Sequence, residues 1–183
     1  IEIDILGAPI GKQDQYGCAI GGIKQIDFNK DGSVDLIEIP DTNNLYFNDE
    51  NKLILVNTNK TRSASNLLKK QKADSKKNEN KLIKILKNVP AFRDNLISQN
   101  FDGVNMLISD YWDQKKKIMS DDKILDLYSS FVPEFCDSGK ICGAGGGGYF
   151  LFFKKKSSKL QNKEFLNLKI DTKGSVIIYN NYF

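Results

Sequence analysis

KICGAGGGGYFLFF, residues 140–153, places six small residues between two apolar segments. Glycines can adopt positive φ, so the backbone of this run can turn tightly and let a bulky anion approach its amide groups. A run of adjacent glycines also loses much conformational entropy when it becomes ordered. The run therefore favours a ligand-facing loop, and the alternative is an inert turn.

The residues that follow the glycines exclude two common phosphate-binding motifs. Gly143, Gly145 and Gly148 satisfy the pattern G-x-G-x-x-G, but a dinucleotide-binding fingerprint must open a helix. Residues 149–153, YFLFF, are instead an aromatic run typical of a buried strand. No Gly-Lys-Ser or Gly-Lys-Thr ends the glycine run, so a Walker loop is excluded as well.

Length and composition are those of an ordinary soluble globular protein. The chain has 183 residues, of which 40% are hydrophobic and 27% charged, and this predicts one domain or little more. No stretch approaches the run of about 20 apolar residues that a membrane span needs. Residues 1–7 lack the basic start of a signal peptide. The net charge of +4 favours anionic ligands only weakly.

The residue types restrict the possible chemistry. Cys18, Cys136 and Cys142 stand at no metal-ligand spacing and the chain has no histidine, so we predict no zinc or haem site. Reduced thiols fit a cytoplasmic protein best. Without histidine, acid–base chemistry must fall to Asp, Glu, Lys or Tyr.

Hydrophobic periodicity and turn residues predict strands mixed with helices, without regular βαβ alternation, and therefore an α+β fold. Pro90 should break or kink the chain after a lysine-rich helix, and the helical spacing around Trp112 places that side chain in the core. The predicted strands are 23–28, 33–39, 52–58, 149–153, 168–170 and 176–179. The predicted helices are 13–20, 62–73, 69–87, 102–119, 121–130 and one near 157–167.

The first two predicted strands contain a competing motif. Residues 27–38, DFNKDGSVDLIE, match the loop of a calcium-binding EF-hand, D-x-N-x-D-G-x5-E. An EF-hand needs helices on both sides, however, and Gly21-Gly22 before the loop and Pro40 after it disfavour them. Asp31-Gly32 between two apolar alternations indicates a β-hairpin instead.

The many lysines of residues 69–87 also allow two interpretations. Leu82, Ile83, Ile85 and Leu86 predict an amphipathic helix, with the lysines on a solvated face. A nucleic-acid surface is disfavoured because no aromatic residues interleave with the lysines to stack on bases.

Three segments together resemble the GHMP kinases, the superfamily that includes galactokinase, homoserine kinase and mevalonate kinase. KICGAGGGGYFLFF is similar to the third signature motif of that superfamily, and residues 11–16, GKQDQY, resemble the segment in which sugar kinases carry an active-site aspartate followed by glutamine. Together with residues 61–64, TRSA, the pattern most resembles the D-glycero-D-manno-heptose 7-phosphate kinases. The resemblance covers essentially the whole chain.

The resemblance implies the C-terminal half of a two-domain fold, with helices packed on a mixed or antiparallel sheet. Residues 1–51 would end the N-terminal catalytic domain, and residues 52–183 would form the C-terminal domain. It also implies transfer of a phosphoryl group from ATP, with Mg²⁺, to a sugar or sugar phosphate. The implied acceptor is D-glycero-D-manno-heptose 7-phosphate at its anomeric hydroxyl, in the biosynthesis of nucleotide-activated heptose for capsule or lipopolysaccharide.

The resemblance assigns candidate roles to individual residues. Asp14 would orient or deprotonate the acceptor hydroxyl, and the alternative is that it caps a helix beginning near Gln15. Lys12, Gln13 and Arg62 would contact the substrate, although Lys12 and Arg62 are equally well interpreted as surface residues. The glycines of the loop would lie against the phosphate loop of the N-terminal half and support the nucleotide: Gly143, Gly145, Gly146, Gly147 and Gly148.

The chain carries no Gly/Ser-rich phosphate loop and no magnesium ligands of the kind that these kinases need, so we expect it to require the N-terminal half of the same protein for activity. Two other classes of function remain open at this point. One is a non-catalytic module that binds an anion at the glycine loop. The other is a calcium-binding protein, which rests on residues 27–38 alone.

Overall fold

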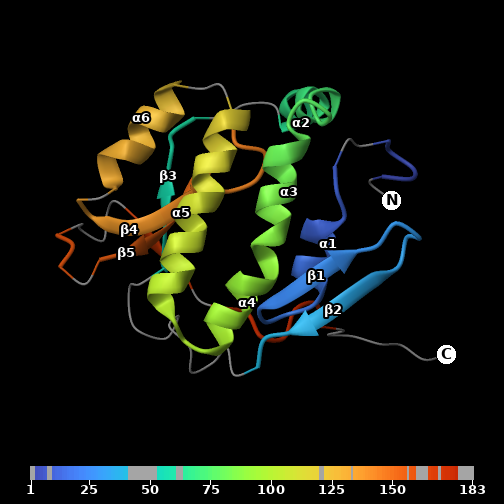
Figure 1. Cartoon of the computed structure of the whole chain (residues 1–183), viewed down its shortest axis with the longest axis horizontal. Helices are drawn as coiled ribbons and strands as arrows, with labels where there is room; N and C mark the ends of the chain where they lie inside the picture. The colour runs from blue at the N-terminus through green and yellow to red at the C-terminus, as the bar shows by residue number, and fades with distance from the viewer. Residues whose placement is uncertain are drawn as a thin grey trace.

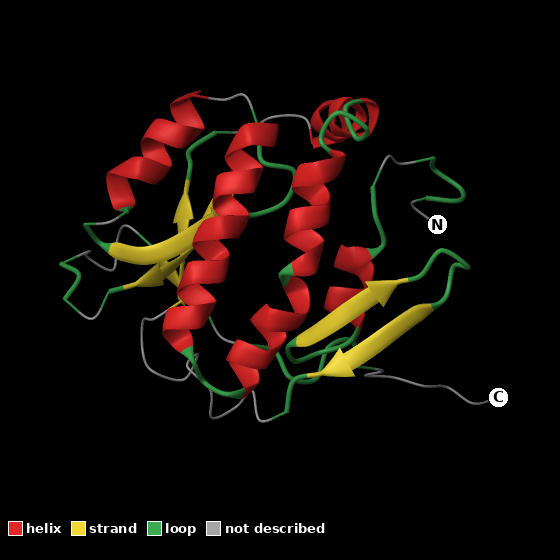
Figure 2. Cartoon of the chain, viewed as in Figure 1, coloured by secondary structure: helices red, strands yellow, loops and turns green. Residues whose placement is uncertain are grey.

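The computed structural model describes residues 3–7, 10–40, 53–60, 64–119, 122–132, 134–155, 157–159, 165–168 and 170–176. Within these ranges six helices and six strands form an α+β architecture, as the sequence predicts (Figures 1 and 2). The helices are α1 Gln13–Ala19, α2 Ala64–Ala73, α3 Glu79–Lys87, α4 Val89–Ile97, α5 Phe101–Ile118 and α6 Asp122–Phe131. The strands are β1 Lys24–Phe28, β2 Val34–Glu38, β3 Leu53–Asn57, β4 Cys136–Ile141, β5 Tyr149–Lys154 and β6 Leu166–Asn167.

The main sheet has four antiparallel strands in the order β4-β5-β3-β6. The aromatic strand β5 lies between β4 and β3, and Phe150 and Phe152 are opposite Val56 and Ile54 of β3. All four side chains are buried, because alternate residues of a strand point to the same face of the sheet. β5 is thus the buried strand that the aromatic run predicts.

Helices α5 and α6 cover that face of the sheet (Figure 1). Trp112 of α5 stacks on Tyr128 of α6 with ring centroids 4.3 Å apart, and both rings contact Phe150 edge-on. Offset and edge-to-face aromatic pairs of this kind add to the free energy gained from burial. Trp112 is only 2% exposed, so its predicted place in the core is confirmed.

A second sheet consists of β1 and β2 alone, paired from Lys24 opposite Glu38 to Phe28 opposite Val34. Ile39, the residue after β2, belongs to a second apolar cluster together with Leu96 of α4 and Val104 of α5. The hairpin over residues 27–38 excludes the EF-hand interpretation, because both flanks of the turn are strands. Asp31 instead accepts hydrogen bonds of 2.9 and 2.7 Å from the amide and hydroxyl of Ser33 and so stabilises the turn.

The structure differs from the sequence predictions in several segments. The lysine-rich segment forms two helices, α2 and α3, rather than one helix over 69–87, and Leu82, Ile83 and Leu86 are exposed on α3. Strand β4 was missed because its sequence, CDSGKI, is mostly polar, although Ser138 is fully buried and donates a 2.6 Å hydrogen bond to Asn105. Leu166–Asn167 is strand β6, not the end of a helix.

The predicted strand over 168–170 is also wrong, because strand β6 ends at Asn167 and neither Leu168 nor Ile170 belongs to a strand. The other element predictions agree with the structure or fall outside the described residues. Pro90 is the second residue of α4, which begins directly after α3 ends, so the predicted break is present. The predicted strand over 176–179 falls almost wholly outside the described residues. No helix in the described ranges has both the length and the apolar character needed to cross a membrane.

Candidate active site

Asp14, the candidate catalytic carboxylate, lies in the first turn of the short helix α1. Lys12 occupies the N-cap position without a side-chain hydrogen bond, so Asp14 does not cap the helix, and that alternative is wrong. The side chains of Lys12, Gln13 and Asp14 are all exposed. They make no hydrogen bond or ion pair with the described part of the chain, which leaves all three available to a ligand.

Helix α1 is held between the hairpin and the C-terminal segment. Tyr16 contacts Phe28 edge-on at 5.7 Å, and the amide of Ser175 donates a 3.1 Å hydrogen bond to the carbonyl of Ala19. Gly21 lies so close to the backbone of Gly174 that a Cβ atom would overlap it. The helix is therefore held at its middle and at its C-terminal end although none of its residues is buried.

The glycine loop, residues 142–148, connects the antiparallel strands β4 and β5 rather than opening a helix. This geometry agrees with the exclusion of a dinucleotide fingerprint. Four of its glycines have positive φ: Gly143, Gly145, Gly147 and Gly148, at 64°, 101°, 146° and 86°. Among the described residues, the amides of residues 143–147 find no hydrogen-bond acceptor. Successive free amides in such a turn are the usual backbone site for an anion.

The end of the loop is fixed against the segment after β3. The amide of Gly148 donates a 3.0 Å hydrogen bond to the carbonyl of Lys60, while Thr58 donates to the carbonyl of Gly148 from both its amide and its hydroxyl, at 2.8 and 2.9 Å. A Cβ atom on Gly147 would overlap the carbonyl of Lys60, so glycine is required there for close approach of two backbones.

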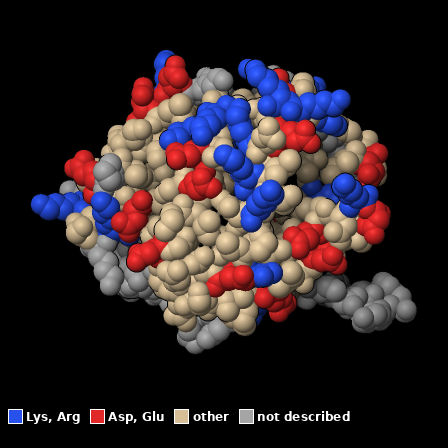
Figure 3. All heavy atoms as spheres, viewed as in Figure 1, with Lys and Arg blue, Asp and Glu red and all other residues tan. Residues whose placement is uncertain are grey.

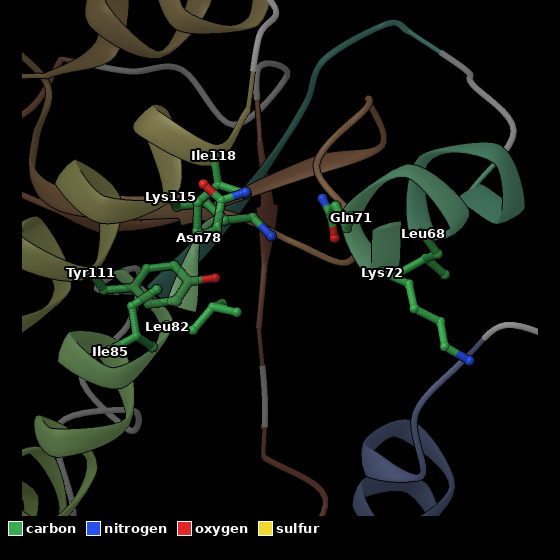
Figure 4. Close-up of a pocket in the computed structure, with 9 residues that line it drawn as sticks. All are labelled: Leu68, Gln71, Lys72, Asn78, Leu82, Ile85, Tyr111, Lys115 and Ile118. Carbon is green, nitrogen blue, oxygen red and sulfur yellow. The ribbon is translucent and has the colours of Figure 1, made fainter. Parts of the chain in front are cut away.

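The start of the loop borders a cavity of about 410 Å³ between α2, α3 and α5. Gln71 of α2 lines the cavity and donates a 2.8 Å hydrogen bond to the carbonyl of Ala144. In Figure 4 the Tyr111 hydroxyl and the Lys115 ammonium point into this space, and Gln71 faces them from α2. The full lining is Leu68, Gln71, Lys72, Asn78, Leu82, Ile85, Tyr111, Lys115 and Ile118.

The cavity has a positive electrostatic character. Burial, together with repulsion from Lys140, lowers the pKa of Lys115 below its usual value. Lys140 lies over the ring of Tyr111, 5.4 Å from its centroid, and burial raises the pKa of the Tyr111 hydroxyl. Lys and Arg side chains gather on the upper part of the face shown in Figure 3, over the helices that form the cavity.

The predicted site residues thus fall into two described groups, the start of α1 and the glycine loop, while Arg62 lies outside the described residues. Asn78, Tyr111 and Lys115 were not identified from the sequence. Tyr111 and Lys115 lie on α5, where their spacing indicates only an amphipathic helix, and Asn78 precedes α3. The approach of α2 and α3 that closes the cavity has no local sequence signal. No group of three Asp, Glu, Cys or His side chains in the described ranges is arranged to hold a metal ion.

The sequence matches no protein-family profile and no characterised protein. Its structure, in contrast, is similar to solved structures. A D-glycero-D-manno-heptose 1-phosphate kinase from Bacteriodes thetaiotaomicron superposes with a TM-score of 0.58 at 19% identity, covering 98% of this chain and 53% of that one. This chain has a GHMP-kinase fold. A second GHMP kinase, L. major mevalonate kinase solved with R-mevalonate, gives a TM-score of 0.54 at 16% identity, covering 75% of this chain and 41% of that one.

The similarity to GHMP kinases covers nearly all of this chain but only about half of the first of these kinases. The fold is the one found in the superfamily that the glycine loop and residues 11–16 resemble in sequence. At these identities the similarity establishes the fold, and the activity has to be argued from the residues.

Proposed function

We propose that this chain forms the C-terminal half of an ATP-dependent sugar kinase of the GHMP type. The observation that carries the proposal is the glycine loop, whose free amides lie on a GHMP-kinase fold beside a positive cavity. Phosphoryl transfer passes through a loose transition state, so catalysis consists mainly of alignment and neutralisation of oxygen charge. Backbone amides and lysines supply both.

Asp14 is the proposed group that orients or deprotonates the acceptor hydroxyl. It is exposed and has no partner among the described residues, so it is accessible to a substrate that approaches α1. Lys12 and Gln13 adjoin it and are proposed to bind the substrate, together with Arg62. A positioned acid or base of this kind contributes about a hundredfold or more to the rate.

ATP would supply the phosphoryl group that is transferred. The amides of residues 143–147 fit its phosphates, because they are donors without an acceptor in the described ranges of the chain. The described residues do not offer a carboxylate cluster for Mg²⁺, so we assign the magnesium ligands to the N-terminal half of the same protein.

Exposed apolar side chains support a second half as the partner. Phe28, Leu36 and Ile37 of the hairpin are 46%, 41% and 38% exposed, and Ile5 and Leu6 near the start of the chain are 75% and 71% exposed. A two-stranded sheet is marginal by itself and usually gains stability from further packing. We propose that the N-terminal half covers these residues.

The substrate that we propose is a sugar phosphate, D-glycero-D-manno-heptose 7-phosphate, phosphorylated at its anomeric hydroxyl. The test is ATP-dependent phosphorylation of a sugar panel that includes this compound, with the protein containing both halves, and with its Asp14→Asn variant. We expect turnover of one sugar phosphate and a loss of about a hundredfold or more in the variant. Turnover that is unchanged in Asp14→Asn would remove Asp14 from the mechanism.

A non-catalytic anion-binding module is the alternative function. The free amides of the glycine loop favour it as much as they favour a kinase, since anion binding needs no carboxylate. Binding of ATP without turnover of any sugar, unaffected by Asp14→Ala, would select this alternative.

A further inference from the structure

The cavity between α2, α3 and α5 presents hydrogen-bond donors that no described residue uses. The ammonium of Lys115 and the hydroxyl of Tyr111 point into it (Figure 4), and neither makes a hydrogen bond or ion pair with the described part of the chain. Lys115 is half-buried, and the charged group that acts on it electrostatically is another cation, Lys140. A half-buried cation without a carboxylate partner is costly unless a ligand neutralises it.

Asn78 adds a third donor to this cavity, and its orientation is fixed. The residue is 7% exposed, and its Oδ1 accepts a 2.8 Å hydrogen bond from the ammonium of Lys81. Because Oδ1 is used by Lys81, Nδ2 is the atom of the amide that can contact a ligand in the cavity. Nδ2 has no acceptor among the described residues.

The rest of the lining is apolar and comes from all three helices. Leu68, Leu82, Ile85 and Ile118 form this wall, and Gln71 separates the cavity from the glycine loop. A volume of about 410 Å³ lies within the range of pockets for small organic ligands. An apolar wall facing a cluster of donors fits a carbon skeleton that carries an anionic group at one end.

We propose that this cavity binds the phosphate group of a phosphorylated sugar, held by Lys115, Asn78 Nδ2 and the Tyr111 hydroxyl. The inference rests on the proposed function, since it makes this phosphate the non-reacting group of the acceptor. Three convergent donors match a phosphate monoester, whose oxygens all accept hydrogen bonds. The apolar wall contacts the carbon chain, and the acceptor hydroxyl is left outside the cavity.

The test is a calorimetric titration of the protein with D-mannose 6-phosphate, and in parallel with D-mannose and with ATP. We expect D-mannose 6-phosphate to bind and D-mannose to bind at least tenfold more weakly, because hydrogen bonds to charged groups supply this difference. Lys115→Met keeps the length of the side chain and removes its charge, and should weaken D-mannose 6-phosphate binding about tenfold or more. Asn78→Asp keeps the contact with Lys81, replaces the donor by a carboxylate and should weaken binding at least as much.

Lys116→Met is the matched control, because Lys116 is the next residue of α5 and pairs with Asp113 at 2.7 Å on the surface. It should leave the affinity unchanged, and circular dichroism should show that all three variants are folded. Equal binding of D-mannose and D-mannose 6-phosphate, or unchanged affinity in both Lys115→Met and Asn78→Asp, would overturn the proposal. A loss of ATP affinity alone in these variants would assign the cavity to the nucleotide and overturn it as well.

Because binding is measured without turnover, this result is independent of the kinase assay. If the protein binds D-mannose 6-phosphate through Lys115 but phosphorylates no sugar, the proposed site stands and the proposed activity is contradicted. If the Lys115→Met variant turns over a sugar phosphate with full activity, the proposed activity stands and the proposed site is contradicted.

Discussion

The side-chain amide of Gln71 in α2 donates a 2.8 Å hydrogen bond to the carbonyl of Ala144 in the glycine loop. These residues are 73 positions apart in the sequence. The bond joins the wall of the cavity to the loop that carries the free amides, so a ligand in the cavity and an anion on the loop would share this contact.

Gln71→Leu should loosen the start of the glycine loop. The substitution keeps most of the side-chain volume and removes one hydrogen bond, which is worth about 0.5–1.5 kcal/mol. Hydrogen exchange of the Cys142 and Gly148 amides, which are the hydrogen-bonded amides of the loop, should become faster, with little change in the exchange of α5. Lys70→Gln, on an exposed position of the same helix, is the control. Exchange that is equally fast in both variants would show that the contact does not hold the loop.

Substitution of alanine for two glycines of the loop should lower the free energy of unfolding by different amounts. A Cβ atom on Gly147 would overlap the Lys60 carbonyl, whereas a Cβ atom on Gly143 would meet nothing within 4 Å. Both have positive φ, so Gly143→Ala should cost about 1–2 kcal/mol from backbone strain alone. Gly147→Ala adds a steric clash and should cost about 2–4 kcal/mol. Urea unfolding measures both values, and equal costs would contradict the close approach at Lys60.

Lys115→Met should raise the free energy of unfolding at neutral pH. Burial first, and then Lys140, lower the pKa of Lys115 in the folded protein below 10.5, so the unfolded chain holds this proton more tightly. The resulting destabilisation is fully present below the folded pKa and disappears as pH rises toward the unfolded value. The gain from Lys115→Met should therefore shrink between neutral pH and about pH 10.5. Thermal unfolding at several pH values tests this, and a gain of the same size at neutral pH and at about pH 10.5 would contradict it.

The three cysteines should react with a thiol reagent at clearly different rates. Cys18 is exposed, Cys142 is half-buried, and Cys136 is fully buried. Burial, with a contribution from Asp137, raises the pKa of Cys136 to about 12, and burial also raises the pKa of Cys142. Because the thiolate is the reactive form, Cys18 should react first at pH 8, Cys142 more slowly, and Cys136 only on unfolding. A titration with Ellman's reagent, assigned by mass spectrometry, gives the order.

The sequence by itself determined much of the local structure. Aromatic residues after the glycines predicted the buried strand β5, the Asp31-Gly32 turn predicted the hairpin, and the spacing around Trp112 predicted α5. These features depend on backbone preference and on periodic burial, both of which are properties of short stretches. The glycine run and the residues around Asp14 also indicated the superfamily whose fold the chain has.

Only the tertiary structure decided where strand β4 lies and which side chains line the cavity. β4 is polar in sequence and forms a strand because β5 pairs with it and α5 covers it. Asn78 is the N-cap residue of α3, whereas Tyr111 and Lys115 lie on α5, more than thirty positions further along the chain, and none of the three stands out in its local sequence. Their donors converge because α3 packs along α5 beside α2, and packing between distant segments has no signature in a local pattern.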